Sequence, residues 1–346
     1  MELTGYIGTY TKEESKGVYH FTLDTDEKKI TNVKLAAELS NPTYLTISED
    51  NKHVYAVSKE GEDGGVAAFA IEDNGDLTKL NSLTLPGSPP CHVSVNRDKQ
   101  VVLSANYHTK KVVSYYVQED GSLQAEASVV EFEGSGPHER QEKPHLHFAG
   151  FSPDERFAVI VDLGSDQVYT YLVRDGELTK ANVYKTKPGC GPRHIAFHPN
   201  GKFAYVMTEL SSEVIALSYD EENGSFQEIA YYSSIPEDFT ETNDASAIHI
   251  SPDGKFVYAG NRGHSSIAIF KVNEEDGTLT FVDWTSTEGN WPRDFVLDPS
   301  GKFVVAVNQK TNDMSLFSRD EESGRLTLLQ SGVKVPEPVC VKFMKK

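Results

Sequence analysis

The sequence predicts an all-β fold, a seven-bladed β-propeller with four antiparallel strands per blade. Three observations lead to this fold class: a turn that recurs at a steady spacing, four strand-like segments in each repeat, and one repeat divided between the two ends of the chain. Together they predict one domain over residues 1–346, a length that closed all-β folds reach as a single unit.

The recurring turn is similar to Pro-Asn-Gly. Its central residues are separated by 48, 56, 46, 53 and 47 positions, and they are Asp50, Asp98, Asp154, Asn200, Asp253 and Ser300. Internal repeats of this length are typical of propellers and solenoids. Alternating segments flank each turn, for example HIAFH before Asn200 and FAYVMT after it. Period-two alternation with β-branched and aromatic residues indicates two strands.

Each repeat continues with two further strands. Segments such as KVVSYYVQE and SSIAIFKVN are the expected third strands, and a glycine-containing turn follows each one. These glycines are Gly75, Gly121, Gly176, Gly224, Gly277 and Gly324. Asp-Gly in such a turn is a hairpin signal, so a segment such as LTFVDWTS is the expected fourth strand. Four antiparallel strands in about 40–50 residues describe a propeller blade.

The seventh blade is expected to combine both ends of the chain. The first residues supply YIGTYT, GVYHFTLD and ITNVKLAAEL, which have the pattern of strands two to four. The last residues supply PVCVKFMKK, which has the pattern of strand one. Joining them would close the ring and remove exposed sheet edges. A β-sandwich, the alternative all-β fold, does not predict a repeat that is split in this way.

Charge and composition limit the partners. Lys plus Arg total 33 against 52 Asp plus Glu, which gives a net charge of −19. This argues against nucleic acid or a membrane as a partner, but it allows a local basic pocket because exposed charges are screened beyond about 8 Å. The segment MELTGYIGTYTKEES has no basic n-region and no long apolar run, so we expect no signal peptide, no membrane span and a cytoplasmic location. The expected assembly is a monomer or weak homodimer.

The cysteines do not indicate a disulfide framework or a metal site. There are three of them, far apart in sequence and without metal-like spacing: Cys91, Cys190 and Cys340. No GxSxG elbow, P-loop or GxGxxG motif occurs in the sequence, so neither a serine or cysteine nucleophile nor a cofactor is expected.

Propeller topology brings polar residues to one face. The links between blades and the links between strands two and three lie on this face, here called the near face, while the other turns lie on the far face. Arg193 and Glu209 share the near face because one hairpin returns both of its ends to it. The long segments EFEGSGPHERQEKP and IPEDFTETND also fall there and could cover the mouth of the channel.

A cluster of ionisable side chains is expected at this mouth. His147, Arg193 and Arg293 occupy equivalent positions at the start of the innermost strand in three blades, and Glu209 and Arg262 close second strands in two adjacent blades. Guanidinium groups suit carboxylate or phosphate ligands. Salt bridges that tie the blades together are the alternative explanation for these arginines.

The other histidines allow several interpretations. His145 precedes His147 by two positions, but no third ligand follows at a suitable spacing, so we expect no metal. His92 and His249 lie on innermost strands, where they could line the site or satisfy core hydrogen bonds. Three more histidines are interpreted as surface or packing residues: His138, His194 and His198.

Over nearly its whole length the chain resembles the bacterial seven-bladed propeller 6-phosphogluconolactonases, which are related to fungal carboxymuconate-lactonizing enzymes. The resemblance is carried by NPTYLTISEDNKHVYAVS, GPRHIAFHPNGKFAYVMTEL, IHISPDGKFVYAGNR and WPRDFVLDPSGKFVVAVNQK. Part of this pattern is common to propellers in general. Pro192-Arg193-His194 together with Glu209-Leu210 is the more specific part.

The resemblance implies hydrolysis of 6-phospho-D-glucono-1,5-lactone in the oxidative pentose phosphate pathway, without a metal. The family's proposed active-site residues correspond to His147, Arg193, Glu209 and Arg262. The expected partner is therefore a small anionic lactone, a sugar phosphate. Arg293, His145, His249 and His92 are expected to contribute to substrate binding.

The sequence leaves the base and the reaction open. Either Glu209 or His147 can activate water, but nearby arginines lower the pKa of a carboxylate, which favours His147 as the base and Glu209 as its orienter. Arg193 or Arg262 would hold the oxyanion, and Arg293 with another arginine would hold the phosphate. A muconate-type cycloisomerase would use the same residues on a dicarboxylate, and a non-catalytic propeller that binds a protein or a small anion is the third possibility.

Overall fold

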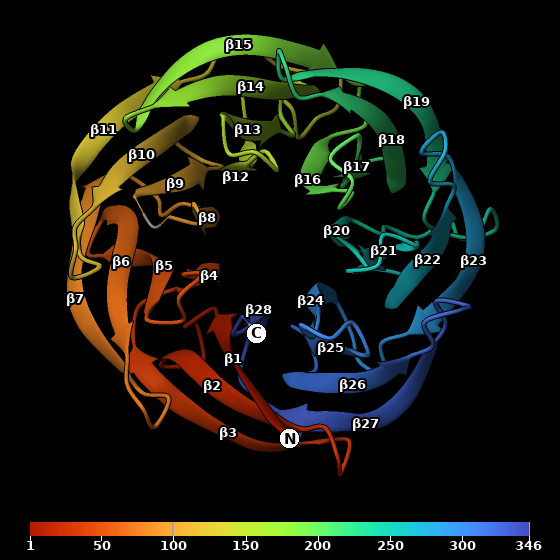
Figure 1. Cartoon of the computed structure of the whole chain (residues 1–346), viewed down its shortest axis with the longest axis horizontal. Coiled ribbons are helices and arrows are strands. Elements are labelled where there is room, and N and C mark those ends of the chain that lie inside the picture. Colours follow the sequence, from red (N-terminus) through yellow and green to blue (C-terminus); the bar gives the residue numbers. More distant parts are fainter. Residues whose placement is uncertain (99, 346) are drawn as a thin grey trace.

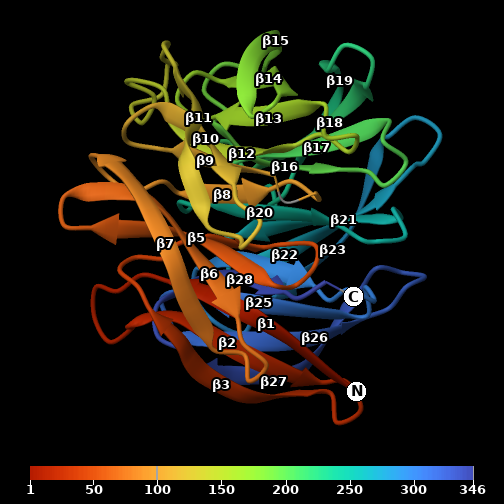
Figure 2. The same ribbon diagram turned by 60° about the vertical axis from the view of Figure 1, so that its left-hand side comes forward.

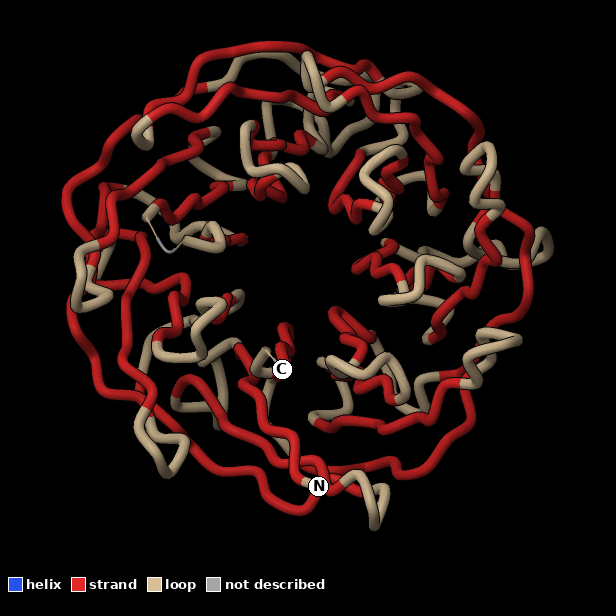
Figure 3. Tube along the Cα trace, in the orientation of Figure 1, coloured by secondary structure: helices blue, strands red, loops and turns tan. Residues whose placement is uncertain are grey.

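The computed structural model describes residues 1–98 and 100–345; Lys99, in the predicted turn at Asp98, and Lys346 lie outside them. The described residues form 28 strands in seven four-stranded antiparallel sheets, arranged as a ring around a central channel (Figure 1). The trace in Figure 3 consists of strands and their connections. Within this part of the chain there is no helix of the length and hydropathy needed to cross a membrane. The predicted seven-bladed propeller is confirmed.

The blades follow one another along the chain, and in each the strands run from the channel outward. One blade combines the first three strands of the chain with the last one and is here called the closing blade. It consists of β28 (Pro338–Phe343), β1 (Glu2–Thr9), β2 (Gly17–Asp24) and β3 (Lys29–Glu38). The next three blades are β4 (Leu45–Ile47), β5 (His53–Glu60), β6 (Asp63–Ile71) and β7 (Leu77–Pro86); β8 (His92–Val95), β9 (Val101–Asn106), β10 (Lys111–Val117) and β11 (Leu123–Glu131); and β12 (Leu146–Phe151), β13 (Phe157–Asp162), β14 (Gln167–Arg174) and β15 (Glu177–Lys185). The last three are β16 (Pro192–Phe197), β17 (Phe203–Thr208), β18 (Glu213–Asp220) and β19 (Ser225–Ser233); β20 (Ala245–Ile250), β21 (Phe256–Asn261), β22 (Ser266–Val272) and β23 (Leu279–Ser286); and β24 (Pro292–Leu297), β25 (Phe303–Asn308), β26 (Asp313–Arg319) and β27 (Leu326–Lys334).

The ring is closed by pairing between the first and last strands, as the split repeat predicts. β1 and β28 are antiparallel, with Ile7 opposite Val341 and Gly5 opposite Phe343. Both ends of the chain accordingly lie on one blade in Figure 1 and in the turned view of Figure 2. If the two ends of the chain were apart, β1 and β28 would each expose an edge with unpaired backbone N–H and C=O groups. Their pairing satisfies these groups.

The core consists of apolar layers between neighbouring blades. The described residues form seven buried clusters, and each joins the strands of two adjacent blades. One cluster brings Ile7 and Phe21 of the closing blade against Val305 and Leu316 of the preceding blade. Each fully buried side chain of this kind contributes roughly 1.5–3 kcal/mol. The alternation in the sequence therefore corresponds to contacts between blades.

The far-face turns add polar links between blades. The glycines that follow the third strands have φ angles between 71° and 86°, the left-handed region that glycine enters without steric cost. Their carbonyl groups accept hydrogen bonds from side-chain hydroxyls of the preceding blade, for example Tyr205 Oη to Gly277 at 3.1 Å, Tyr258 Oη to Gly324 at 2.8 Å and Thr170 Oγ1 to Gly224 at 2.8 Å. With the far face fixed in this way, the starts of the innermost strands are held around the near-face mouth.

Candidate active site

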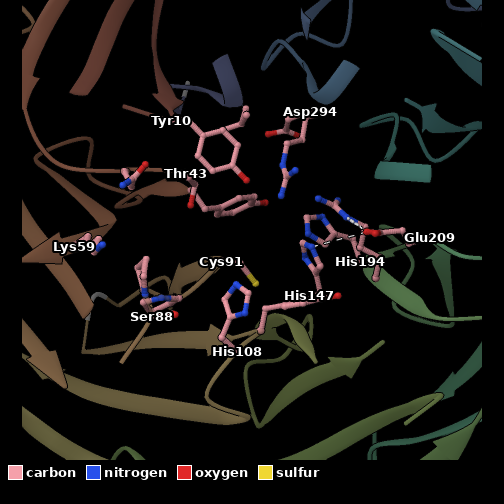
Figure 4. Close-up of a pocket in the computed structure, with 18 of the residues that line it drawn as sticks. Tyr10, Thr43, Lys59, Ser88, Cys91, His108, His147, His194, Glu209 and Asp294 are labelled. Atoms are coloured by element: carbon pink, nitrogen blue, oxygen red, sulfur yellow. Dashed lines mark hydrogen bonds and ion pairs between the residues drawn. The ribbon is translucent and has the colours of Figure 1, made fainter. Parts of the chain in front are cut away.

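A cavity of about 430 Å³ opens at the near-face mouth of the channel (Figure 4). Its lining holds two carboxylates, Glu209 and Asp294. It also holds six cationic side chains: Lys12, Lys59, Arg140, Arg193, Arg262 and Arg293. In a chain of net charge −19, this cavity carries an excess of positive charge and is suited to an anionic ligand.

Irregularities in three innermost strands aim three of the predicted side chains into this cavity. In β12, β16 and β24 the pairing with the second strand shifts by one residue. His147, Arg193 and Arg293 are the residues left without a cross-strand partner at these shifts, and all three line the cavity. Bulges of this kind commonly re-aim a side chain next to a functional site. The three residues that the sequence predicts at equivalent positions of their blades therefore also have the same local strand geometry.

Glu209 lies immediately after β17 and is the centre of an ion-pair network. Its side chain is 3% exposed. Glu209 Oε2 accepts hydrogen bonds from Arg193 Nε at 3.1 Å and contacts Arg262 Nη2 at 2.9 Å, while Oε1 pairs with Arg140 Nη2. Burial alone would raise the pKa of Glu209, but the guanidinium charges outweigh burial and hold that pKa well below its usual value. Glu209 is therefore ionised at neutral pH.

The arginines of the network are also fixed at their other atoms. Arg193 Nη1 donates to the carbonyl of Ser246 at 2.7 Å, and Arg140 Nη1 pairs with Asp244 Oδ1 at 2.8 Å. Arg262 Nε donates to the carbonyl of Asp244. Burial, followed by repulsion from Arg262, lowers the pKa of Arg193 to about 10, so this guanidinium stays charged at neutral pH. The network joins two blades to the segment that follows β11.

His147 lies beside Glu209 but keeps one free ring nitrogen. Its Nε2 is 4.0 Å from Glu209 Oε2, and its side chain is buried. Burial and the charge of Arg193 hold the pKa of His147 well below its usual value, so the ring is neutral at neutral pH. Its Nδ1 is buried and has no hydrogen-bond partner among residues 1–98 and 100–345.

A layer of aromatic rings, here called the floor cluster, lies at the channel side of the cavity. It consists of Tyr44, His92, Phe148 and His194, with His92 packed 4.3 Å from both Tyr44 and Phe148 between ring centroids. Burial lowers the pKa of His92 to about 3 and that of His194 well below its usual value. The histidines of the floor cluster are therefore neutral rings at neutral pH.

The comparisons with known proteins agree with this geometry. Residues 4–343 match the family described as "Lactonase, 7-bladed beta-propeller". A Bacillus subtilis protein named 6-phosphogluconolactonase is 56% identical over 341 residues, which is 98% of each chain. The chain belongs to the seven-bladed β-propeller lactonase family.

Two solved structures show how closely the fold of this lactonase family member is shared. A protein from Lactobacillus plantarum is 43% identical and superposes with a TM-score of 0.97 over 100% of both chains. The periplasmic gluconolactonase of Pseudomonas aeruginosa is 31% identical and superposes with a TM-score of 0.93 over 99% of both chains.

Five of the eight predicted site residues meet at the cavity of this lactonase-family chain: His147, Arg193, Glu209, Arg262 and Arg293. Figure 4 shows His147 and Glu209 on the same side of the cavity, joined by a marked interaction. The proximity expected from the sequence is therefore observed, whereas the chemical role of each residue stays a prediction.

The three remaining predicted residues lie outside the cavity lining. His145 packs in the wall, where its ring stacks on Tyr107 at 4.1 Å and its Nδ1 lies 2.8 Å from the carbonyl of the same tyrosine. His92 belongs to the floor cluster. His249 lies further down β20, with its Nε2 3.7 Å from Asp294 Oδ1. We place these three around and beneath the site.

The lining also contains residues that were not predicted as site residues from the sequence, among them Arg140, Tyr10 and Lys12. Arg140 belongs to the long segment EFEGSGPHERQEKP, which the sequence predicts near the mouth. Its contact with Glu209 was not predicted. Tyr10 and Lys12 follow β1 and have no motif of their own. His194, interpreted from sequence as a surface or packing residue, packs in the floor cluster and also lines the cavity.

Cys91 lines the cavity but is a poor nucleophile there. Burial raises the pKa of its thiol to about 12, which keeps it protonated at neutral pH. Within the described residues, no group of three or more His, Cys, Asp or Glu side chains is arranged to hold a metal ion. The arrangement is suited to acid–base and electrostatic chemistry on an anionic ligand.

Proposed function

We propose that this protein hydrolyses 6-phospho-D-glucono-1,5-lactone to 6-phosphogluconate, the lactonase step of the oxidative pentose phosphate pathway. The observation that carries the proposal is a neutral histidine beside an ionised carboxylate that is surrounded by arginines, in a cationic cavity. The name and the 56% identity of the Bacillus subtilis relative support the choice of substrate. Lactone hydrolysis requires an activated water and a group that stabilises the tetrahedral oxyanion, and this cavity offers candidates for both.

His147 is the proposed general base. Glu209 is a weak base because three arginines hold its pKa well below the usual value, whereas the unpartnered Nδ1 of the neutral His147 ring can accept a proton. The Glu209 carboxylate, 4.0 Å from Nε2, would orient the ring and stabilise the imidazolium that forms. A positioned general base contributes about 10²–10⁴-fold to such reactions.

The arginines are proposed to stabilise the developing negative charge. As water oxygen bonds to the lactone carbonyl carbon, its proton passes to His147 and the carbonyl oxygen becomes an oxyanion near Arg193 or Arg262. The bond from the carbonyl carbon to the ring oxygen then breaks, and the imidazolium returns the proton to that oxygen. The carboxylic acid so formed loses a proton to solvent. Removal of one oxyanion donor costs about 2.7–4 kcal/mol in comparable sites.

The direct test is the lifetime of freshly generated 6-phosphogluconolactone with and without the protein, after subtraction of spontaneous ring opening. We expect acceleration by the wild type and its loss in Arg193→Ala. Acceleration that Arg193→Ala leaves intact would move the reaction away from this cavity. No acceleration by the wild type would contradict the proposal and favour a different lactone, a muconate-type acid or a binding role.

The other expectations about the cellular setting accompany this proposal. A cytoplasmic location, a monomer or weak homodimer, and the lack of nucleic-acid or membrane partners stay predictions. Size-exclusion chromatography with light scattering would test the assembly, and cell fractionation would test the location.

A further inference from the structure

Two cationic side chains of the cavity contact the same aromatic ring. Lys12 Nζ lies 4.3 Å from the centroid of the Tyr10 ring, and Arg293 Cζ lies 5.5 Å from it. All three residues line the cavity. Among the described residues, neither Lys12 nor Arg293 forms an ion pair, that is, no carboxylate oxygen lies within 4.0 Å of their charged nitrogen atoms.

The other arginines of the cavity differ in this respect. Arg193, Arg262 and Arg140 each contact Glu209, and Arg140 also pairs with Asp244. Part of their positive charge is therefore compensated by protein carboxylates. In Figure 4, Tyr10 lies across the cavity from Glu209 and His147. The Tyr10 ring, which both Lys12 and Arg293 contact, is thus separated from Glu209 and His147.

A buried glutamate, Glu337, makes most of the hydrogen bonds that hold the segment carrying Lys12. Glu337 Oε1 accepts from the backbone N–H of Lys12 at 3.0 Å, and Oε2 accepts from Glu13 at 3.0 Å and Ser15 at 3.2 Å. The backbone N–H of Tyr10 donates to the carbonyl of Glu337 at 3.0 Å. Because these four bonds fix the backbone of the loop, ligand binding costs little further backbone entropy.

We propose that Lys12, Tyr10 and Arg293 form a phosphate subsite that binds the phosphomonoester group of the substrate and aligns its lactone ring with His147 and the Glu209 network. This inference rests on the proposed function and deepens it. A phosphomonoester carries a charge of about −1.5 to −2 at pH 7. Lysine and arginine donate charge-assisted hydrogen bonds to such a group, and the Tyr10 hydroxyl adds a neutral donor. The second phosphate ligand beside Arg293 is then Lys12 and not another arginine.

The subsite predicts a specific change in substrate preference. We would measure kcat/KM for 6-phosphogluconolactone and for unphosphorylated glucono-δ-lactone in the wild type, in Lys12→Ala and in Lys12→Ala/Arg293→Met. Charge-assisted hydrogen bonds of this kind correspond to roughly a tenfold factor each, so the double variant should lose about 100-fold of the preference for the phosphorylated lactone. The kcat/KM for the unphosphorylated lactone should fall much less than that for the phosphorylated lactone, so the ratio of the two values is the quantity that tests the subsite.

Lys310→Ala is the matched control. Lys310 Nζ lies 3.6 Å from the centroid of the Trp291 ring, so it repeats the cation–ring contact, but it does not line the cavity. This variant should keep the wild-type preference. Inorganic phosphate offers a second measurement: it should inhibit the wild type competitively and should inhibit Lys12→Ala about tenfold less strongly.

The outcomes separate this inference from the proposed function. A wild type that accelerates neither lactone overturns both. A wild type that hydrolyses the phosphorylated lactone, with an unchanged preference in the double variant and unchanged phosphate inhibition in Lys12→Ala, overturns the subsite alone. Because Lys12 is exposed, Lys12→Ala is expected to fold normally, so this single variant still decides the question if the double variant is unstable.

Discussion

Two buried arginine clusters lie on opposite faces of the propeller, and they differ in charge balance. On the far face, Arg319 donates to Tyr258 Oη at 2.8 Å and to the carbonyl of Gly301 at 3.0 Å, and its Nη2 contacts both oxygens of Asp253 at 3.1 and 2.8 Å. On the near face, Glu209 contacts three guanidinium groups, and of these only Arg140 has a second carboxylate partner, Asp244. The far-face cluster pairs one cation with one anion, whereas the near-face cluster has more cations than anions.

The difference separates a structural arginine from arginines available to a ligand. In the pair of Arg319 with Asp253, every guanidinium nitrogen has an acceptor within the protein, and Arg319 does not line the cavity. An excess of buried positive charge is unfavourable unless an anion compensates it, and stability is commonly sacrificed in this way at functional sites. The near-face cluster therefore has the properties of a ligand site, and the far-face cluster serves as its internal control.

Glu209→Gln should have the largest effect, because it removes the one carboxylate that the three arginines share. We expect turnover of the phosphorylated lactone to fall at least tenfold. Loss of one partner of a buried ion pair costs about 3–5 kcal/mol, so the free energy of unfolding should also fall. Steady-state kinetics and urea unfolding would measure the two effects. Wild-type turnover in Glu209→Gln would show that the network is only structural.

Arg319→Met should affect stability and leave turnover unchanged. We expect a loss of about 3 kcal/mol in the free energy of unfolding, at the low end for a broken buried pair because Asp253 is partly exposed. Turnover per folded molecule should match the wild type, because Arg319 lies on the opposite face from the cavity. A loss of turnover as large as that of Glu209→Gln would remove the distinction between the two clusters.

His147→Ala should reduce turnover at least tenfold, with a smaller loss of stability than Glu209→Gln, because no ion pair is left with an unmatched charge. His145→Gln is the matched comparison, since His145 is a buried histidine two positions away whose ring packs in the wall. Its effect on turnover should be clearly smaller. Equal losses in both variants would argue against His147 as the base.

His194→Phe should have the smallest effect, a change in the pH dependence of stability. The pKa of His194 is lowered by burial, so the folded protein keeps this ring neutral while the unfolded chain takes up a proton below about pH 6.5. Stability is therefore lost as pH falls below this value, by about 1.4 kcal/mol per pH unit for each such histidine. Between pH 6.5 and 5.5 the unfolded-state ring is only partly protonated, so in urea unfolding the variant should lose about 1 kcal/mol less stability than the wild type over this interval. An unchanged slope would contradict neutral burial of this ring.

The fold and most of the site centre could be predicted because both follow from the repeat. Residues that occupy the same position in different blades, such as His147, Arg193 and Arg293, must surround the same mouth. Their spacing in the sequence therefore predicts that they lie close together. His249 lies outside the cavity lining because it is three residues further down its strand than Ser246, and each residue adds about 3.3 Å. Arg140 could not be assigned because its contact with Glu209 depends on the path of a loop without periodicity.

The pairing of β1 with β28 also sets the order in which the molecule becomes active. The ring can close only after the last strand has left the ribosome, and contacts between residues so far apart in sequence form slowly. Glu337, which holds the Lys12 segment, immediately precedes this strand. A nascent chain that already carries His147, Arg193 and Glu209 thus still lacks the wall of the cavity formed by Tyr10 and Lys12. A copy that ends before β28 would therefore lack both ring closure and the Glu337 contacts that position Lys12, and we expect it not to bind substrate.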